Sequence, residues 1–243
     1  MEMPGDIAAT LVQAVRRDWH DRGDPKLSPF VAALSEALDG GLTVPAAASG
    51  AAPPAGFDAA LAAMTASAPL GDALRALLPA VTWKPLLGRH PDVPETLSEG
   101  LHVALLLAGL GLVSAVGPER IRMGLFHLAP GVHYPLHSHE ATEVYHCLAG
   151  SLRLQHGLSG KPFTLSPGAH SVTPSERVHS LTTSEAPVLL LFAWTEPFQA
   201  PIYWWERDGE APWHRVRWIR DSQNVWARQE AEPVSPALLA EQA

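Results

Sequence analysis

Apolar residues in the first hundred positions recur with the period of an α-helix. Ile7, Leu11 and Val15 are spaced four residues apart, so they share one face of a helix that Trp19 extends. A second helix is expected to begin after Ser28, a suitable N-cap residue. This second helix is expected to cover 29–38, and two more short helices are expected at 57–64 and 70–78. The first part of the chain is therefore predicted to be helical.

From about residue 120 the pattern changes to short runs of β-favouring residues. Glycine and proline separate these runs at short intervals, which is typical of an all-β sandwich or barrel. The runs are 120–131, 143–157, 161–181 and 188–197. A mainly β domain is therefore predicted to follow the helical region.

Three stretches set the expected boundaries between these parts. The small, proline-interrupted stretch 45–56 predicts a loop or linker. The apolar stretch 103–112 is about half the ~20 residues that cross a bilayer, so it predicts a buried helix end or strand. From 224 on, polar residues and alanines predict a loosely held tail. We expect a helical region at 1–110 that packs on or over a barrel. The barrel, with the metal site, is expected at 111–222 and a C-terminal tail at 223–243.

Composition narrows the kind of protein. The 243 residues are 47% hydrophobic and 17% charged, which fits a folded domain rather than a disordered one. A net charge of −8 indicates neither a nucleic-acid partner nor an anionic membrane. The lone Cys147 has no partner for an internal disulfide, and the N-terminal residues lack the apolar run of a signal peptide. A soluble, cytoplasmic protein is expected.

The stretch HSHEATEVYH, 137–146, concentrates metal-ligand types. His137 and His139 are two residues apart and project from the same face of a strand. After a short turn, Glu143 and Tyr145 project together from the next stretch. Two imidazoles and a carboxylate that converge in this way are typical of a first-row transition-metal site.

Flanking glycines and a second motif extend this pattern. The first motif runs from Gly131 to Gly150 with the histidines and glutamate between them, and the second is Gly168-x5-Pro174-x4-His179. Together they resemble the two motifs of the cupin superfamily. The resemblance implies a double-stranded β-helix, or jelly-roll barrel, that binds one metal ion. The ligands that it implies are His137, His139, Glu143 and His179.

The second motif departs from the cupin pattern at Glu176, where glycine is common. This departure changes a turn and need not remove the metal site. Ligands of this kind accept Zn, Fe, Mn, Co or Ni according to supply, so one divalent transition metal of unknown identity is expected. The remaining nearby histidines, His133, His146 and His170, are not expected to be ligands.

The wider stretch 123–150 resembles the bacterial cupin-type dimethylsulfoniopropionate (DMSP) lyases. That resemblance implies a β-elimination in which the substrate carboxylate lies on the metal, and dimethyl sulfide and acrylate are formed. Lowering a phenol pKa from 10 to ~7 takes about 4 kcal/mol, which a nearby cation supplies. By this argument and the resemblance, Tyr145 is the general base and Tyr134 an auxiliary group. The alternative for Tyr145 is a barrel-core tyrosine that is hydrogen-bonded to Glu143.

The sulfonium group of DMSP requires a second binding surface. Aromatic faces attract such cations, and Trp194 begins an aromatic-rich stretch that continues to Trp205. Most of these aromatic residues are expected only to pack the barrel against the N-terminal helices, with Trp194 as a candidate for substrate binding. Cys147 is expected to be a small buried residue without a redox or ligand role.

Two other functions fit the same ligands. An iron-dependent cupin oxygenase would need oxygen but would not need a phenol at position 145. A non-catalytic cupin that binds a metal or ligand would bind metal without turnover. The expected partner is a small carboxylate such as DMSP, and the resemblance is also compatible with a homodimer. A lid formed by the N-terminal helices over the barrel mouth is a further hypothesis.

Overall fold

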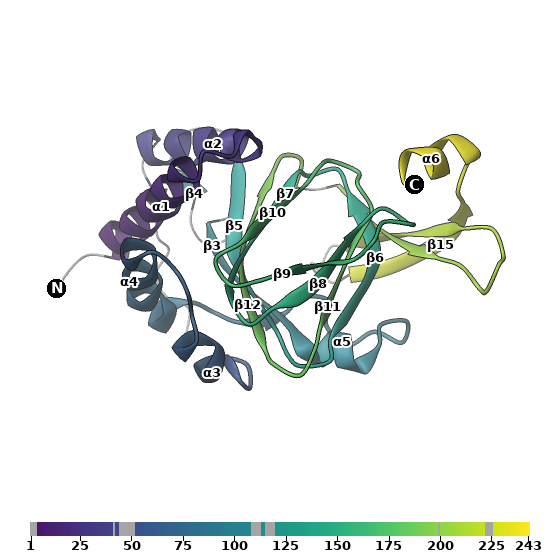
Figure 1. The fold of residues 1–243 in the computed structure, drawn as a ribbon, viewed down its shortest axis with the longest axis horizontal. Helices are drawn as coiled ribbons and strands as arrows, with labels where there is room; N and C mark the ends of the chain where they lie inside the picture. Colours follow the sequence, from purple (N-terminus) through teal and green to yellow (C-terminus); the bar gives the residue numbers. More distant parts are fainter. Residues whose placement is uncertain are drawn as a thin grey trace.

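Two antiparallel sheets facing each other form a β-barrel, and four helices lie against one side of it (Figure 1). This computed structural model describes residues 4–40, 42–43, 52–107, 113–114, 120–198, 200–221 and 226–243. The prediction of a mainly β cupin barrel preceded by a helical region is confirmed.

The first sheet has six strands in the order β10-β7-β12-β5-β3-β2. Its strands are β2 (Lys84–Pro85), β3 (Leu101–Leu107), β5 (Ile121–Leu128), β7 (Glu143–Ala149), β10 (His170–Thr173) and β12 (Val188–Thr195). A separate two-stranded ribbon joins β1 (Leu42–Thr43) to β4 (Val113–Ser114).

The second sheet has seven strands in the order β15-β14-β13-β6-β11-β8-β9. Its strands are β6 (His133–His139), β8 (Leu152–His156), β9 (Phe163–Leu165), β11 (His179–Thr183), β13 (Ile202–Glu206), β14 (His214–Arg220) and β15 (Trp226–Pro233). Non-consecutive neighbours such as β6 and β11 bring the two motifs of the sequence side by side.

Helices α1 to α4 agree with the periodicity of the sequence to within a few residues, whereas α5 and α6 were not predicted. The helices are α1 (Pro4–Asp21), α2 (Ser28–Asp39), α3 (Phe57–Ala62), α4 (Ala68–Leu77), α5 (Glu95–Gly100) and α6 (Pro236–Glu241), with 3-10 turns at Pro25–Leu27 and Leu78–Ala80. The expectation that Ser28 is an N-cap is wrong. The 3-10 turn before it continues directly into α2, so Leu27 occupies the cap position without a side-chain hydrogen bond.

The six-stranded sheet separates two hydrophobic cores. Successive residues of a strand point to opposite faces. Leu189 and Leu191 of β12 therefore pack with the helices α1 to α4, whereas Leu190 and Phe192 face the barrel interior. One face of this sheet is covered by helices, and the other face lines the barrel.

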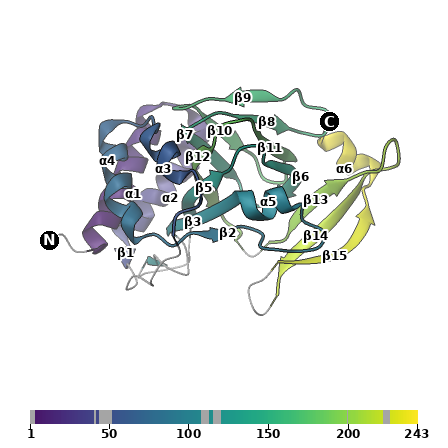
Figure 2. The same cartoon turned by 90° about the horizontal axis from the view of Figure 1, so that it is seen from below.

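The four N-terminal helices therefore pack on the wall of the barrel (Figure 2). Trp19, Phe30 and Leu74 are buried in the core that they share with the sheet. None of their described residues lines the cavity inside the barrel. This arrangement does not agree with a lid over the mouth, because the apolar stripes of the helices are buried against the sheet.

The C-terminal residues also differ from the expected loose tail. Strand β15 pairs with β14 over residues 226–233, and α6 follows it. The stretch 103–112 begins inside β3, and 45–56 falls largely outside the described residues. No helix in the described ranges is long and apolar enough to cross a membrane.

Candidate metal centre and substrate cavity

Three strands from the two facing sheets bring the ligand residues together. His137 and His139 lie on β6, Glu143 begins β7, and His179 begins β11, where it pairs with His137. The turn before β6 contains Gly131 with a φ of 73°, a conformation that glycine adopts without strain. The first motif therefore spans two consecutive strands that lie in opposite sheets, and the second motif supplies the strand that pairs with β6.

The three imidazoles form one buried group. Ligand atoms of His137, His139 and His179 all lie within 4.8 Å of one another, and the three side chains are at most 3% exposed. Each ring also has a backbone carbonyl beside its Nδ1 atom. These contacts join His137 to Pro135 O at 2.8 Å, His139 to Ala141 O at 2.8 Å and His179 to Arg177 O at 3.0 Å.

Glu143 completes the group and is fully buried. Its Oε2 atom lies 3.1 Å from Nε2 of His139 and 3.3 Å from Nε2 of His179. Its Oε1 atom is buried without a hydrogen-bond partner among the described residues.

This arrangement of lone pairs fits a divalent cation. A carbonyl oxygen only accepts, so each Nδ1 atom carries the proton and each Nε2 atom presents a lone pair to the centre. Burial lowers the pKa of His137 and of His179, which keeps both rings neutral. Nitrogen lone pairs and a carboxylate that face one another repel unless a cation lies between them. The donor set therefore suits a first-row transition metal.

Both candidate tyrosines lie beside the histidines. The hydroxyl of Tyr145 is 3.4 Å from Nε2 of His179, and the ring of Tyr134 stacks on His137 with centroids 3.9 Å apart. Burial raises the pKa of Tyr145 well above its usual value, and the charge of Glu143 adds to this effect. Burial also raises the pKa of Tyr134. A phenolate at position 145 therefore requires a positive charge next to it.

Trp194 contacts the same group from β12. Its ring centroid is 4.4 Å from that of His139, and the residue is the register partner of Glu143 on β7. On its other side it pairs with Arg122 of β5. Trp194, Glu143 and Arg122 therefore lie at one level across three adjacent strands.

The expectation that most aromatic residues after Trp194 pack against the N-terminal helices does not hold for Trp204. Trp204 and Trp218 pack against each other with centroids 4.9 Å apart, within the barrel core rather than against the N-terminal helices. They lie on β13 and β14, in the seven-stranded sheet. Cys147 is buried, and burial raises its pKa to about 12, so it does not supply a reactive thiolate.

The remaining histidines lie outside the site. His146 points to the opposite face of β7, where Nε2 is 2.9 Å from Arg22. His170 contacts Asp24 at 2.8 Å on that same side. His133 contacts Thr182 at 2.8 Å and is exposed. These three residues do not face the metal-ligand group.

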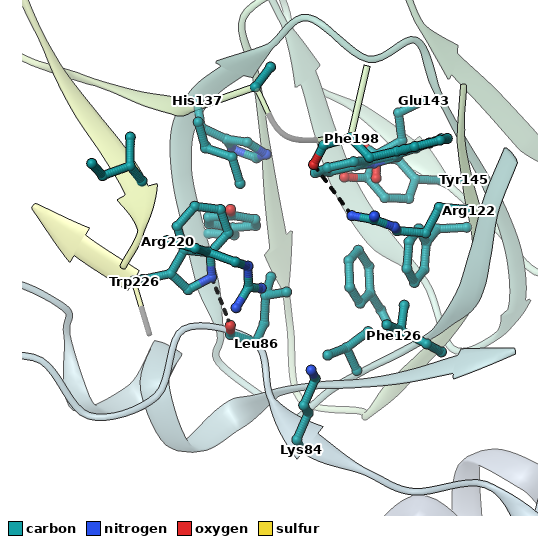
Figure 3. A pocket seen from close by; sticks show the side chains of 18 residues that line it. Lys84, Leu86, Arg122, Phe126, His137, Glu143, Tyr145, Phe198, Arg220 and Trp226 are labelled. Carbon is teal, nitrogen blue, oxygen red and sulfur yellow. Dashed lines mark hydrogen bonds between the residues drawn. The ribbon is translucent and has the colours of Figure 1, made fainter. Parts of the chain in front are cut away.

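A cavity of about 150 Å³ opens beside the metal-ligand group. Figure 3 shows His137, Glu143 and Tyr145 on one side of it. Phe126 and Phe192, which stack with centroids 4.0 Å apart, and Trp194 give it an aromatic wall. Tyr134 lines it as well.

Three basic residues of the lining were missed in the sequence, namely Lys84, Arg122 and Arg220. Arg122 has a weak signal, because it shares the parity of the inward-facing Phe126 on β5. Lys84 and Arg220 come from distant strands, and no local pattern indicates that they meet.

Comparison with known proteins identifies the family. The family model described as DMSP lyase matches residues 43–190. A curated relative, the DMSP lyase DddQ of Ruegeria pomeroyi, is 36% identical over 96 residues, which cover 37% of this chain and 47% of that protein. The match thus spans about half the length of this relative.

Solved structures agree with the fold. The crystal structure of DddQ from Ruegeria pomeroyi superposes with a TM-score of 0.61 and 24% identity, covering 80% of this chain and 94% of that one. A second structure, from the crystal structures of the DMSP lyases RdDddP and RnDddQII, superposes with a TM-score of 0.52 and 23% identity. The superposition covers 79% of this chain and 94% of that one. Because the family model covers more than half of the sequence, this chain belongs to the DMSP lyase family.

Proposed function

We propose that this protein is a metal-dependent carbon–sulfur lyase that cleaves DMSP into dimethyl sulfide and acrylate. The observation that carries the proposal is the hydroxyl of Tyr145, which lies inside the cavity 3.4 Å from Nε2 of His179 in a chain of this family. A group that can hold a proton thus lies next to a site suited to a cation.

The residues proposed to hold the metal are His137, His139, Glu143 and His179. A divalent ion bound there supplies a Lewis acid for the carboxylate of the substrate. Two observations support this assignment. The donor atoms are buried and converge, and the Oε1 atom of Glu143 has no hydrogen-bond partner among the described residues. The identity of the metal is left to the element content of the purified protein.

Tyr145 is proposed as the base. It removes a proton from the carbon next to the carboxylate, the electron pair of that C–H bond forms the new C=C bond, and the C–S pair leaves with neutral dimethyl sulfide. Because burial raises the pKa of Tyr145, its phenolate forms only with a cation next to it. The proposed activity of Tyr145 therefore depends on an occupied metal site.

Two other aromatic residues are given supporting roles. Tyr134 stacks on His137 and is proposed to orient that imidazole rather than to exchange protons. Trp194 lines the cavity beside His139, and its face is proposed to contact the sulfonium. The wall of Phe126 and Phe192 excludes water from the carbanion-like centre.

The test measures dimethyl sulfide released from DMSP by metal-reconstituted protein without oxygen. We expect release from the wild type and a loss of about 10²- to 10⁴-fold in Tyr145→Phe, the range for a general base. Metal content should be equal in both proteins. The control is Tyr203→Phe, because Tyr203 lies against Arg215 away from the cavity.

Each contrary result has a separate meaning. Release by Tyr145→Phe at the wild-type rate would remove Tyr145 from its role and keep the lyase. Absence of release from metal-loaded wild type would reject DMSP as the substrate. Oxygen uptake with other carboxylates would then favour an iron-dependent oxygenase, and turnover of no substrate a non-catalytic binding protein.

A further inference from the structure

The indole of Trp226 lines the cavity from an edge strand of the seven-stranded sheet. Trp226 is the first residue of β15 and the register partner of Arg220 at the end of β14. It is only 8% exposed, although β15 lies at the edge of its sheet. The family model matches residues 43–190, so this part of the cavity wall comes from outside the matched residues.

Two contacts hold the indole in place. Its Nε1 atom donates a hydrogen bond to the carbonyl of Leu86 at 3.1 Å, and the guanidinium of Arg220 lies 4.3 Å from its ring centroid. The backbone N–H of Leu86 donates in turn to the carbonyl of Leu101 on β3 at 3.0 Å. The ring therefore connects the last strand of one sheet to the other sheet, through residues 140 positions apart in the sequence.

Trp226 lies across the cavity from the proposed base. Figure 3 shows Trp226 and Leu86 at the lower left of the cavity, and Glu143 and Tyr145 at its upper right. The cavity volume of about 150 Å³ is small beside the ~300–1,000 Å³ of pockets that hold drug-sized ligands. The cavity therefore has little room beyond that of a small substrate.

We propose that Trp226 is a specificity-determining residue that limits the size of the alkyl groups on the sulfonium of the substrate. The inference rests on the proposed function, in which the substrate carboxylate lies at the metal-ligand group and Tyr145 faces the carbon next to it. The sulfur is attached to the following carbon, so its two alkyl groups extend away from the metal-ligand group and towards Trp226. Methyl groups fit in front of the indole, whereas longer groups meet a ring that its two contacts hold in place.

The rigidity of this wall is what allows it to select by size. A hydrophobic pocket distinguishes substrates that differ by one methylene by about 10- to 200-fold, provided that its wall does not yield. Lys84 also lines the cavity, but it is exposed and has a flexible side chain that can move aside. The buried indole of Trp226, fixed at Nε1 and on its ring face, cannot do so.

The experiment compares DMSP with diethylsulfoniopropionate as substrates of the metal-reconstituted full chain. The diethyl compound forms diethyl sulfide and acrylate by the same elimination, and each of its alkyl groups has one more methylene. We expect the wild type to prefer DMSP by at least about tenfold in kcat/KM. Trp226→Ala should reduce this preference by at least about tenfold, and Trp226→Phe, which keeps a smaller ring, by less.

A second variant and a control separate size selection from general damage. Leu86→Ala keeps the indole, opens space beside it and should also reduce the preference. Trp213→Ala removes an indole that lies over Arg207 outside the cavity, and it should keep the wild-type preference. Because both substrates are measured on one sample, a partly unfolded fraction does not change their ratio.

The possible failures are distinguishable. Equal use of both substrates by the wild type, or a preference that every active variant keeps, would overturn the role of Trp226 and leave the proposed function intact. Variants of Trp226 and Leu86 that cleave neither substrate would also overturn it, because this wall would then be needed for cleavage itself. Cleavage of neither substrate by metal-loaded wild type would reject the proposed function, and this role with it.

Discussion

The side-chain oxygen of Gln242 accepts a hydrogen bond from the backbone N–H of Val178 at 2.9 Å, although 64 residues separate them. The amide nitrogen of Gln242 donates to the carbonyl of Glu176 at 3.0 Å. Arg177, which lies between Glu176 and Val178 in the sequence, donates a hydrogen bond to the carbonyl of Glu241 at 2.8 Å. The end of the chain therefore fastens the segment that leads into His179.

Replacing Gln242 with alanine should loosen this segment. The substitution leaves the buried Val178 N–H without its acceptor, which costs about 1–3 kcal/mol of unfolding free energy. Because His179 follows directly, metal affinity should also fall, by about tenfold, as for other residues that orient a ligand. Denaturant unfolding and metal titration measure the two effects.

The control for this prediction is Gln229→Ala. Gln229 is a half-buried glutamine on β15 whose amide contacts the carbonyl of Ala227 at 3.5 Å. Its loss should affect metal affinity little. A Gln242 variant with lower stability but unchanged metal affinity would limit Gln242 to a structural role.

Glu176 has a φ of 61°, the left-handed region that favours glycine. Glycine relieves this strain but loses more chain entropy on folding, so Glu176→Gly should raise unfolding free energy by about 0.5–1 kcal/mol. Glu176→Ala, which removes the carboxyl and keeps the strain, should not stabilise the protein. Chemical denaturation at pH 7 compares the two. Equal stability of both variants would mean that the carboxyl, rather than φ, determines the effect.

The buried His127 should make stability depend on pH. It lies near Phe57 and Trp83, and neither ring nitrogen has a hydrogen-bond partner among the described residues. Burial, then the charge of His102, lowers its pKa from the ordinary 6.5 to about 4. The unfolded chain therefore takes up a proton at higher pH than the folded chain does. Unfolding free energy is highest above pH 6.5 and falls as pH drops towards 4, by up to about 3 kcal/mol.

Unfolding free energies of wild type and His127→Leu, measured from pH 7.5 to 4, test this contribution. The unfolding free energy of the wild type should fall more steeply with falling pH than that of His127→Leu. The difference in slope should correspond to about one more proton taken up on unfolding. His20→Leu, at an exposed histidine of α1, controls for the loss of an imidazole and should keep the wild-type slope. Parallel curves for wild type and His127→Leu would show that other groups cause the pH dependence.

Removing the metal should lower thermal stability. Metal at a hundred times its dissociation constant adds about 2.7 kcal/mol to the unfolding free energy. For a chain of this size that corresponds to about 5–10 °C in Tm. Chelator should abolish this increment in wild type, and His179→Ala should lack it from the start. His133→Ala, at the exposed histidine that contacts Thr182, should keep it. An increment that survives in His179→Ala would place the ion elsewhere.

The parts of the site that follow from local spacing were predictable. His137 and His139 share one face of β6 by strand parity, and Glu143 follows four residues later at the start of β7, which faces β6 from the other sheet. His179 was added by its motif, and the structure has it paired with His137. Their role as ligands stays a prediction.

Other parts depend on long-range pairing that no local pattern records. Lys84 reaches the cavity because β2 pairs with β3, and Arg220 because β14 joins the sheet beyond β13. Strand β15 has the polar composition of a tail, with an exposed second half, yet it completes an edge of the sheet. Composition reports the environment of such an edge strand rather than its conformation.

The wall formed by β5, β7 and β12 is a single sheet that serves two interiors. Along β12 the residues that support the helices alternate with those that shape the cavity, as Leu191 and Phe192 do. Selection for a stable fold and selection for a new substrate therefore act on alternate residues of β12. On β12 the chemistry can change at the even positions while the odd positions preserve the fold, and on β7 the two sets are exchanged.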